Sequence, residues 1–189
     1  MASELRGLRV AFVTSNEGVE QIELTEPWQA VKDAGGVPEL LAVEGGEVQA
    51  FNHLDKADTF TVHRTVKDAD PADYDAFVVP GGVANGDFLR MSPAALNFAQ
   101  RMFEHGKPAA VICHGPWLLV EADLVRGRTL TSWPSLRTDI RNAGGNWLDT
   151  EVQVCETGPN TLITSRKPDD LPAFNQALTE VFARQGQAA

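Results

Sequence analysis

The sequence alternates short apolar runs with segments of helical spacing, and this alternation constrains the fold more than any other feature. The apolar runs cover residues 10–13, 39–42, 76–79, 109–112 and 161–164, and each has the length of one buried strand. Strands that alternate with helices pair in parallel, because each crossover brings the chain back to the same edge of the sheet. We therefore predict an α/β fold with a mainly parallel sheet sandwiched by helices.

Two helices carry start signals as well as apolar spacing. Ser92-Pro93 precedes one apolar stripe, and Asp170 precedes another that begins at Phe174. Residues 47–65 alternate loosely between polar and β-branched side chains, which predicts a β-hairpin or an irregular excursion at one edge of the sheet. A length of 189 residues fits one domain with a substantial core, and we expect a single domain over residues 1–189.

Net charge and residue composition limit which classes of binding partner and which cellular location we expect for this protein. A formal net charge of -10 repels phosphate backbones and anionic lipid headgroups, so we expect neither a nucleic-acid nor a membrane partner. The first residues lack the apolar core of a signal peptide, and no apolar run approaches the ~18 residues that span a bilayer, so we expect a cytoplasmic protein. The spacing of Cys113, Cys155, His53, His63 and His105 suggests no metal site, and no cofactor is expected.

Cys113 lies at the junction between an apolar strand, residues 109–112, and a helix that begins near Pro116. This position is the carboxyl end of a parallel strand, where open α/β sheets usually carry their sites. Free amides and the helix dipole favour an anion there, so we predict that the thiol pKa falls below its usual value of about 8.5. Gly115 fits the sharp turn of a nucleophile elbow. We predict that Cys113 is a nucleophile.

Other candidate residues have to be weighed against a purely structural role. Cys155 lies in an alternating strand-like run without a helix start, and packing accounts for it. Gly81 and Gly82 follow the strand at 76–79, where they form either an oxyanion hole or a plain tight turn. Trp117 and Trp133 either line a pocket near the elbow or belong to the core, and the core is the commoner place for such aromatics.

Four motifs, in order along the chain, resemble the PfpI family of the superfamily that includes the Parkinsonism-associated deglycase. The resemblance extends from residue 10 to about residue 182. It implies a flavodoxin-like, class I glutamine amidotransferase-like fold. The motifs are Gly18-Val-Glu-Gln-Ile-Glu-Leu24, Pro80-Gly-Gly82, Ile112-Cys-His-Gly-Pro116 and Thr164-Ser-Arg-Lys-Pro-Asp-Asp-Leu-Pro172.

The resemblance also implies roles for individual residues. Cys113 is then the nucleophile, and Glu23 is the acidic residue that hydrogen-bonds its sulfur. The amides of Gly82 and His114, with Gly81 beside them, form an anion-stabilising pocket.

The resemblance further implies a homodimer at least, with a hexamer as the larger alternative. An acidic residue from a neighbouring subunit then orients His114, and the best match for this acid is Asp87. Adjacent residues on a turn need not point their side chains at each other, so His114 acts either through its side chain or through its backbone alone.

Three functions follow from this combination. The first is a stress-response enzyme that acts on reactive carbonyls or glycated adducts, as the glyoxalases and deglycases of the superfamily do. The second is an intracellular cysteine peptidase, which acts on peptides or proteins and requires a competent His114. The third is a non-catalytic oxidative-stress protein whose Cys113 is reversibly oxidised. The sequence does not rank the carbonyl substrates.

Overall fold

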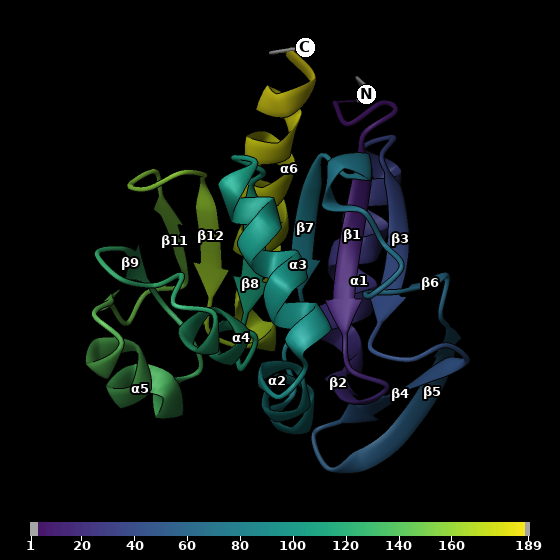
Figure 1. Ribbon diagram of the computed structural model, residues 1–189, viewed down its shortest axis with the longest axis horizontal. Coiled ribbons are helices and arrows are strands. Elements are labelled where there is room, and N and C mark those ends of the chain that lie inside the picture. The colour runs from purple at the N-terminus through teal and green to yellow at the C-terminus, as the bar shows by residue number, and fades with distance from the viewer. Residues whose placement is uncertain (1–3, 188–189) are drawn as a thin grey trace.

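The structure, a computed structural model, describes residues 4–187 and contains a seven-stranded sheet covered by helices on both faces (Figure 1). Its strand order is β11-β12-β8-β7-β1-β3-β6, and every pair is parallel except β11 with β12. The predicted α/β class with a mainly parallel sheet is confirmed.

The strands and helices follow one another along the chain in the order of their labels within each class. The strands are β1 (Arg9–Thr14), β2 (Glu17–Glu20), β3 (Val37–Ala42), β4 (Glu47–Asn52), β5 (Asp55–Thr61), β6 (Arg64–Thr65), β7 (Ala76–Val79), β8 (Ala109–Ile112), β9 (Thr129–Leu130), β10 (Asn146–Trp147), β11 (Val152–Cys155) and β12 (Leu162–Ser165). The helices are α1 (Gln21–Asp33), α2 (Val83–Arg90), α3 (Pro93–Glu104), α4 (Pro116–Glu121), α5 (Arg137–Asn142) and α6 (Leu171–Gln187).

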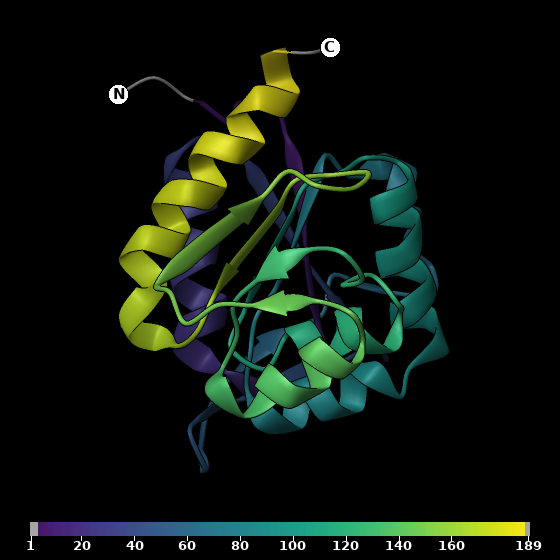
Figure 2. The same cartoon turned by 90° about the vertical axis from the view of Figure 1, so that its left-hand side faces the viewer.

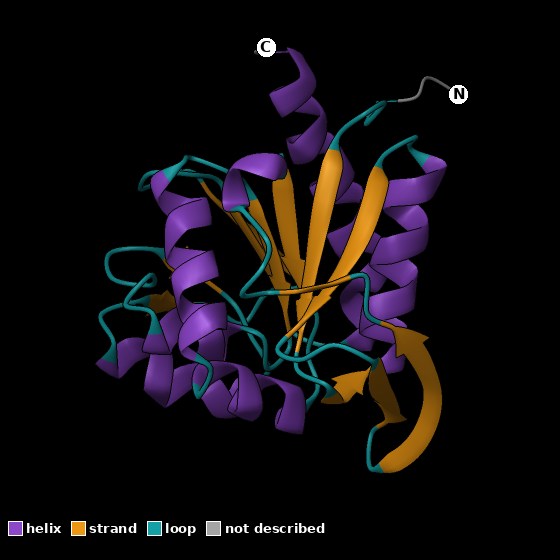
Figure 3. Cartoon of the chain, turned by 45° about the vertical axis from the view of Figure 1, so that its right-hand side comes forward, coloured by secondary structure: helices purple, strands orange, loops and turns teal. Residues whose placement is uncertain are grey.

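The central strands are apolar throughout because both faces of the sheet are buried. In β1, Val10 and Phe12 belong to the apolar cluster shared with α1 and α6, whereas Ala11 and Val13 belong to the cluster shared with α3 and α4. Figure 3 shows the sheet between these helical layers. All five apolar runs of the sequence form strands, and only the last is shifted by one residue, to Leu162–Ser165.

Ser92 and Asp170, the two predicted helix-start residues, both precede helices, but only Ser92 caps its helix. Ser92 caps α3, because its hydroxyl accepts a hydrogen bond from the amide of Ala95 at 3.3 Å. Asp170 directly precedes α6, but its carboxylate accepts hydrogen bonds from Arg166 instead. Both helices bury their apolar stripes against the sheet, as predicted.

The predicted hairpin within residues 47–65 is confirmed as β4 and β5, which pair antiparallel. It belongs to a separate three-stranded sheet, because β4 also pairs in parallel with β2. This small sheet lies beyond the carboxyl end of β1 (Figure 1). Among the described residues, no helix is both long and apolar enough to cross a membrane.

Candidate active site at the carboxyl end of β8

Cys113 occupies a sharp turn between β8 and α4. Its φ of 61° lies in the left-handed region, which is uncommon for a residue other than glycine and often marks a functional site. Backbone hydrogen bonds hold both sides of the turn, since the amide of Cys113 donates to Ser165 O at 3.0 Å and its carbonyl accepts from the amide of Trp133 at 2.9 Å. The side chain is only 6% exposed. The thiol is therefore rigidly placed and shielded from water.

Opposing effects act on the Cys113 thiol. Burial and the neighbouring carboxyl of Glu23 raise its pKa well above the usual value, whereas the amides of Gly82 and His114 lower it. This corrects the expectation from the sequence, which considered the helix start alone. The amides that the sequence placed beside the sulfur are present, but desolvation of a thiolate outweighs them. Whether Cys113 is a thiolate at neutral pH thus depends on the protonation state of Glu23.

Glu23 is fully buried on α1, and burial raises the pKa of its carboxyl to about 8. A carboxyl group with this pKa is protonated and uncharged at neutral pH. Neither of its oxygens makes a hydrogen bond of normal geometry to a described residue, yet Oε2 lies against Gly81 next to the Cys113 side chain, and the Cys113 thiol and the Gly81 amide both lower the pKa of the carboxyl. A protonated Glu23 removes the charge that disfavours a thiolate and offers it a donor instead. Glu23 and Cys113 therefore form one proton-sharing pair.

Gly81 and Gly82 let the backbone approach this pair. A Cβ atom on Gly81 would overlap Glu23 Oε2 and lie 3.0 Å from Cys113 Sγ, so no other residue fits there. Gly82 has a φ of 97° and turns its amide toward the sulfur. The amide of Gly81 instead acts on Glu23, whose pKa it lowers, so its role differs from the predicted anion pocket. The Pro80-Gly-Gly82 motif is thus more than a plain tight turn.

Asn85 positions this turn, and no local sequence pattern marks it. It is fully buried at the start of α2, and its side-chain amide donates to Pro80 O at 3.0 Å and to Gly81 O at 3.1 Å. Its Oδ1 accepts from the amide of Ser15 at 2.8 Å. These bonds link one side chain to the residues that directly follow β1 and β7, so only the tertiary structure identifies the role of Asn85.

His114 faces the thiol with its side chain as well as its backbone. Its Nδ1 atom lies 3.1 Å from Cys113 Sγ, while its ring stacks on Trp133 at 5.7 Å and meets Trp117 edge-on at 5.2 Å. Burial lowers the pKa of His114 to about 4, so the ring is neutral at neutral pH. A neutral imidazole can accept the thiol proton, but its surroundings disfavour the imidazolium that would form.

A cavity of about 160 Å³ opens beside the Cys113–Glu23 pair. Its volume is well below the range of about 300 Å³ and more that is usual for drug-sized ligands. Such a cavity suits a small molecule or the end of a side chain. The lining residues are Glu20, Glu23, His53, Leu54, Gly82, Val83, His114, Trp133 and Pro168.

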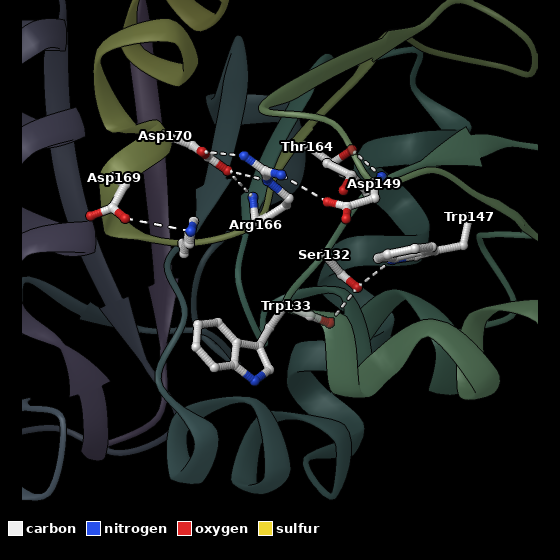
Figure 4. A network of polar contacts seen from close by, with 10 residues as sticks. Ser132, Trp133, Trp147, Asp149, Thr164, Arg166, Asp169 and Asp170 are labelled. Atoms are coloured by element: carbon white, nitrogen blue, oxygen red, sulfur yellow. Dashed lines mark hydrogen bonds and ion pairs between the residues drawn. The ribbon is translucent and has the colours of Figure 1, made fainter.

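A polar network supports one wall of this cavity (Figure 4). Arg166 forms ion pairs with Asp149 at 2.7 Å and with Asp170 at 2.9 Å, and these bonds stabilise the turn that carries Pro168.

The two tryptophans near the elbow differ in role. Trp133 is 38% exposed and lines the cavity, as the pocket interpretation required. Trp117 instead packs against the core and donates from Nε1 to Asp139 at 2.9 Å, so the core interpretation holds for it.

Glu20 and His53 also line the cavity, although no motif in the sequence indicated this. Glu20 is buried at the N-cap of α1, and its carboxylate accepts a hydrogen bond from the backbone amide of His53 at 3.0 Å. His53 is exposed on the β4–β5 turn and also lines the cavity. Only the pairing of the small sheet beside the main one brings these two residues to the site.

Asp87 lies on the exposed side of α2. Within one chain, over residues 4–187, it makes no hydrogen bond to His114, so a hydrogen bond between Asp87 and His114 would need a second chain. No group of three or more His, Cys, Asp or Glu side chains in this described range could hold a metal ion.

Comparisons with known proteins converge on one family. Residues 8–181 match the model of the DJ-1/PfpI family. The chain is 38% identical over 168 residues to the protein named Putative cysteine protease YraA of Bacillus subtilis, covering 89% of this chain and 94% of that one. It is 36% identical over 175 residues to the protein named Deglycase PH1704 of Pyrococcus horikoshii, covering 93% and 99%.

A solved structure agrees with this match. The chain superposes on a two-domain protein with DJ-1/ThiJ/PfpI-like and ferritin-like domains from Anabaena variabilis with a TM-score of 0.84 and 32% identity. The superposition covers 95% of this chain and 48% of that one, so this chain spans about half of the two-domain protein.

Proposed function

This chain belongs to the DJ-1/PfpI family, and from that premise we propose that it is a cysteine-dependent enzyme acting on reactive carbonyls or glycated adducts. One observation carries the proposal. The buried Glu23 carboxyl has no conventional hydrogen-bond partner among the described residues and lies beside Cys113 at a small cavity. A relative at 36% identity is named a deglycase, which fits this chemistry.

The first step is an addition to the carbonyl carbon. It starts from the Cys113 thiolate, which forms when the thiol loses its proton to solvent while Glu23 stays protonated. The sulfur then forms a bond to that carbon, the π electrons move to the carbonyl oxygen, and Glu23 gives its proton to this oxygen. The product is a hemithioacetal beside an ionised Glu23. The amides of Gly82 and His114 stabilise the negative charge on sulfur before the bond forms.

The second step uses Glu23 as a base. Its carboxylate takes the hydrogen of the former aldehyde carbon as a proton and returns a proton to the neighbouring carbonyl carbon of a 1,2-dicarbonyl substrate, while the hydroxyl proton of the former aldehyde carbon passes to the former ketone oxygen. This transfer turns the hemithioacetal into a 2-hydroxy thioester, which water hydrolyses to a 2-hydroxy acid and the free thiol. A carboxyl with a pKa of about 8 is a stronger base than an exposed one and suits this task.

A cysteine peptidase is the second candidate, and the contact between Cys113 and His114 favours it. A general base 3.1 Å from the nucleophile is the geometry that thiol acylation needs. The relative at 38% identity named Putative cysteine protease YraA points the same way. Two observations weigh against it: the small cavity, and the burial that lowers the pKa of His114 to about 4.

Steady-state turnover of methylglyoxal and of a fluorogenic peptide, measured side by side, tests the proposal. Cys113→Ser should abolish catalytic turnover of methylglyoxal because no sulfur remains beside Glu23 to add to the carbonyl. Glu23→Gln should reduce it by about 10²-fold to 10⁴-fold, the usual contribution of a positioned acid or base. Cys155→Ser is the matched control, because it removes the other thiol and should keep full turnover.

Three other outcomes would contradict the proposal. Cleavage of the peptide without methylglyoxal consumption would establish the peptidase. Equal activity of Glu23→Gln and the unmodified protein would remove Glu23 from the mechanism. Turnover of neither substrate, with ready oxidation of Cys113, would favour the non-catalytic oxidative-stress role.

A further inference from the structure

Cys155 lies at the opposite end of the sheet from the candidate active site. It is the last residue of β11 and pairs with Leu162, which in turn pairs with Ala109 at the start of β8. Cys113 follows the other end of β8, so the two thiols have separate surroundings. The β11–β12 connection above Cys155 lies at the same end of the molecule as the chain termini (Figure 1, Figure 2).

Arg128 is a buried cation beside Cys155. It is only 3% exposed, and one face of its guanidinium group covers the ring of Phe103 at 5.5 Å. Its hydrogen bonds all go to neutral groups, namely Asn160 Oδ1 and Asn160 O, both at 2.6 Å, and Cys155 O at 3.0 Å. Its Nε–H group has no partner at all among the described residues.

This arrangement leaves a buried positive charge without a carboxylate. Within residues 4–187, no Asp or Glu lies within ion-pair distance of Arg128. Buried charges in proteins are nearly always paired, because an isolated one loses its hydration without compensation. The nearby Glu156 does not fill the gap, because its exposed carboxylate pairs with Arg184 at 3.1 Å. The thiol of Cys155 is the remaining neighbour that can become an anion.

We propose that Cys155 is a second reactive thiol, held as a thiolate by the Arg128 guanidinium and modified by small electrophiles such as hydrogen peroxide. Burial disfavours a thiolate here, but the Thr129 amide, the Arg128 guanidinium and the Thr157 amide together lower the pKa of the thiol, whose sulfur lies 3.8 Å from Thr157 O. In the reaction with peroxide, the sulfur attacks one oxygen and the O–O bond breaks. The products are a sulfenic acid and hydroxide, so sulfur is oxidised and peroxide reduced.

A thin segment of chain separates this thiol from solvent. Cys155 itself is 5% exposed, but residues 156–159 that cover it are all exposed. Gly158, within this segment, has a φ of 111°, and a Cβ atom there would lie 3.2 Å from Arg128 Nη1. The segment contains no helix or strand, so a small displacement is enough to admit a molecule the size of peroxide.

The test uses the full chain with Cys113→Ser, which leaves Cys155 as its single cysteine. Alkylation by iodoacetamide across pH and trapping of sulfenic acid after hydrogen peroxide are both read by peptide mass spectrometry. The alkylation rate should be half-maximal below the ordinary thiol pKa of about 8.5. Arg128→Gln should move that midpoint up by at least one pH unit, a tenfold change in the acid dissociation constant of the thiol.

Two controls keep the test decisive. Arg128→Lys retains the charge and should retain most of the low midpoint, and Arg184→Gln removes the nearby exposed cation and should change nothing. If Arg128→Gln does not fold, thiolate ultraviolet absorbance of Cys113→Ser against the double variant Cys113→Ser/Cys155→Ser gives the midpoint directly. A midpoint at or above about 8.5, or modification only in denaturant, would overturn the proposal. So would a thiolate that peroxide leaves unmodified.

Discussion

The Sγ atom of Cys113 lies 3.1 Å from Nδ1 of His114, the residue that follows it in the chain. This contact arises because the left-handed backbone of Cys113 turns two adjacent side chains toward each other. In a site where the imidazole could be protonated, this pair would be a nucleophile with its general base. Here burial lowers the pKa of the imidazole to about 4, and the uncharged ring stacks on Trp133 instead.

His114→Ala therefore separates the two enzymatic candidates. The carbonyl mechanism uses the backbone amide of His114, which the variant keeps, so methylglyoxal turnover should fall less than about tenfold. A peptidase that uses the imidazole as base would lose about 10²-fold to 10⁴-fold. The pH profile is a second readout, because a rate that depends on a group titrating near 6.5 would show that the His114 ring titrates as an ordinary imidazole and takes part.

Glu23 should make the stability of the protein depend on pH. Its pKa rises from an ordinary value of 4.5 to about 8 on folding, so between these values the folded state holds a proton that the unfolded state has lost. The free energy of unfolding should then fall as pH rises through this window, by up to about 1.4 kcal/mol per pH unit. Glu23→Gln should flatten this slope. Urea unfolding at several pH values measures it, and identical slopes would contradict the buried protonated carboxyl.

Gly81→Ala should disable the site by steric means alone. The added methyl group would collide with Glu23 Oε2 and press on the Cys113 side chain, so both groups must move. We expect loss of most methylglyoxal turnover and a destabilisation of about 1–3 kcal/mol, typical of an overpacked site. Gly45→Ala is the matched control, since a Cβ atom there meets nothing within 4 Å. Full activity of Gly81→Ala would show that the backbone approach is not required.

A dimer, or a larger assembly, is expected in dilute solution. The family resemblance predicts it, and the surface that carries Asp87 exposes Val83, Phe88 and Met91, an apolar set that a second chain can cover. Light scattering should report at least twice the monomer mass, and Phe88→Glu should lower it, whereas Leu148→Glu on a different exposed apolar side chain should not. A strictly monomeric mass would remove Asp87 as a partner of His114 across an interface.

Much of the framework was predictable from local sequence patterns. Apolar runs such as 76–79 and 109–112 coincide with β7 and β8, because strands buried on both faces must be apolar at every position. The elbow was also predictable, since a strand that ends at Ile112 and a helix that begins at Pro116, four residues later, leave little freedom for Cys113. Ser92-Pro93 marked the start of α3 through a cap that depends only on neighbouring residues.

The chemistry of the site depended on contacts between distant segments. The sequence determined where Cys113 lies and that amides adjoin it, but only the tertiary structure decided that burial and Glu23 raise the pKa of its thiol. It also decided that Asn85 holds the glycine turn, that Glu20 and His53 reach the cavity, and that Arg128 faces Cys155 without a counter-ion. Desolvation and charge pairing are set by what surrounds a group in three dimensions, and chain neighbours supply only part of that environment.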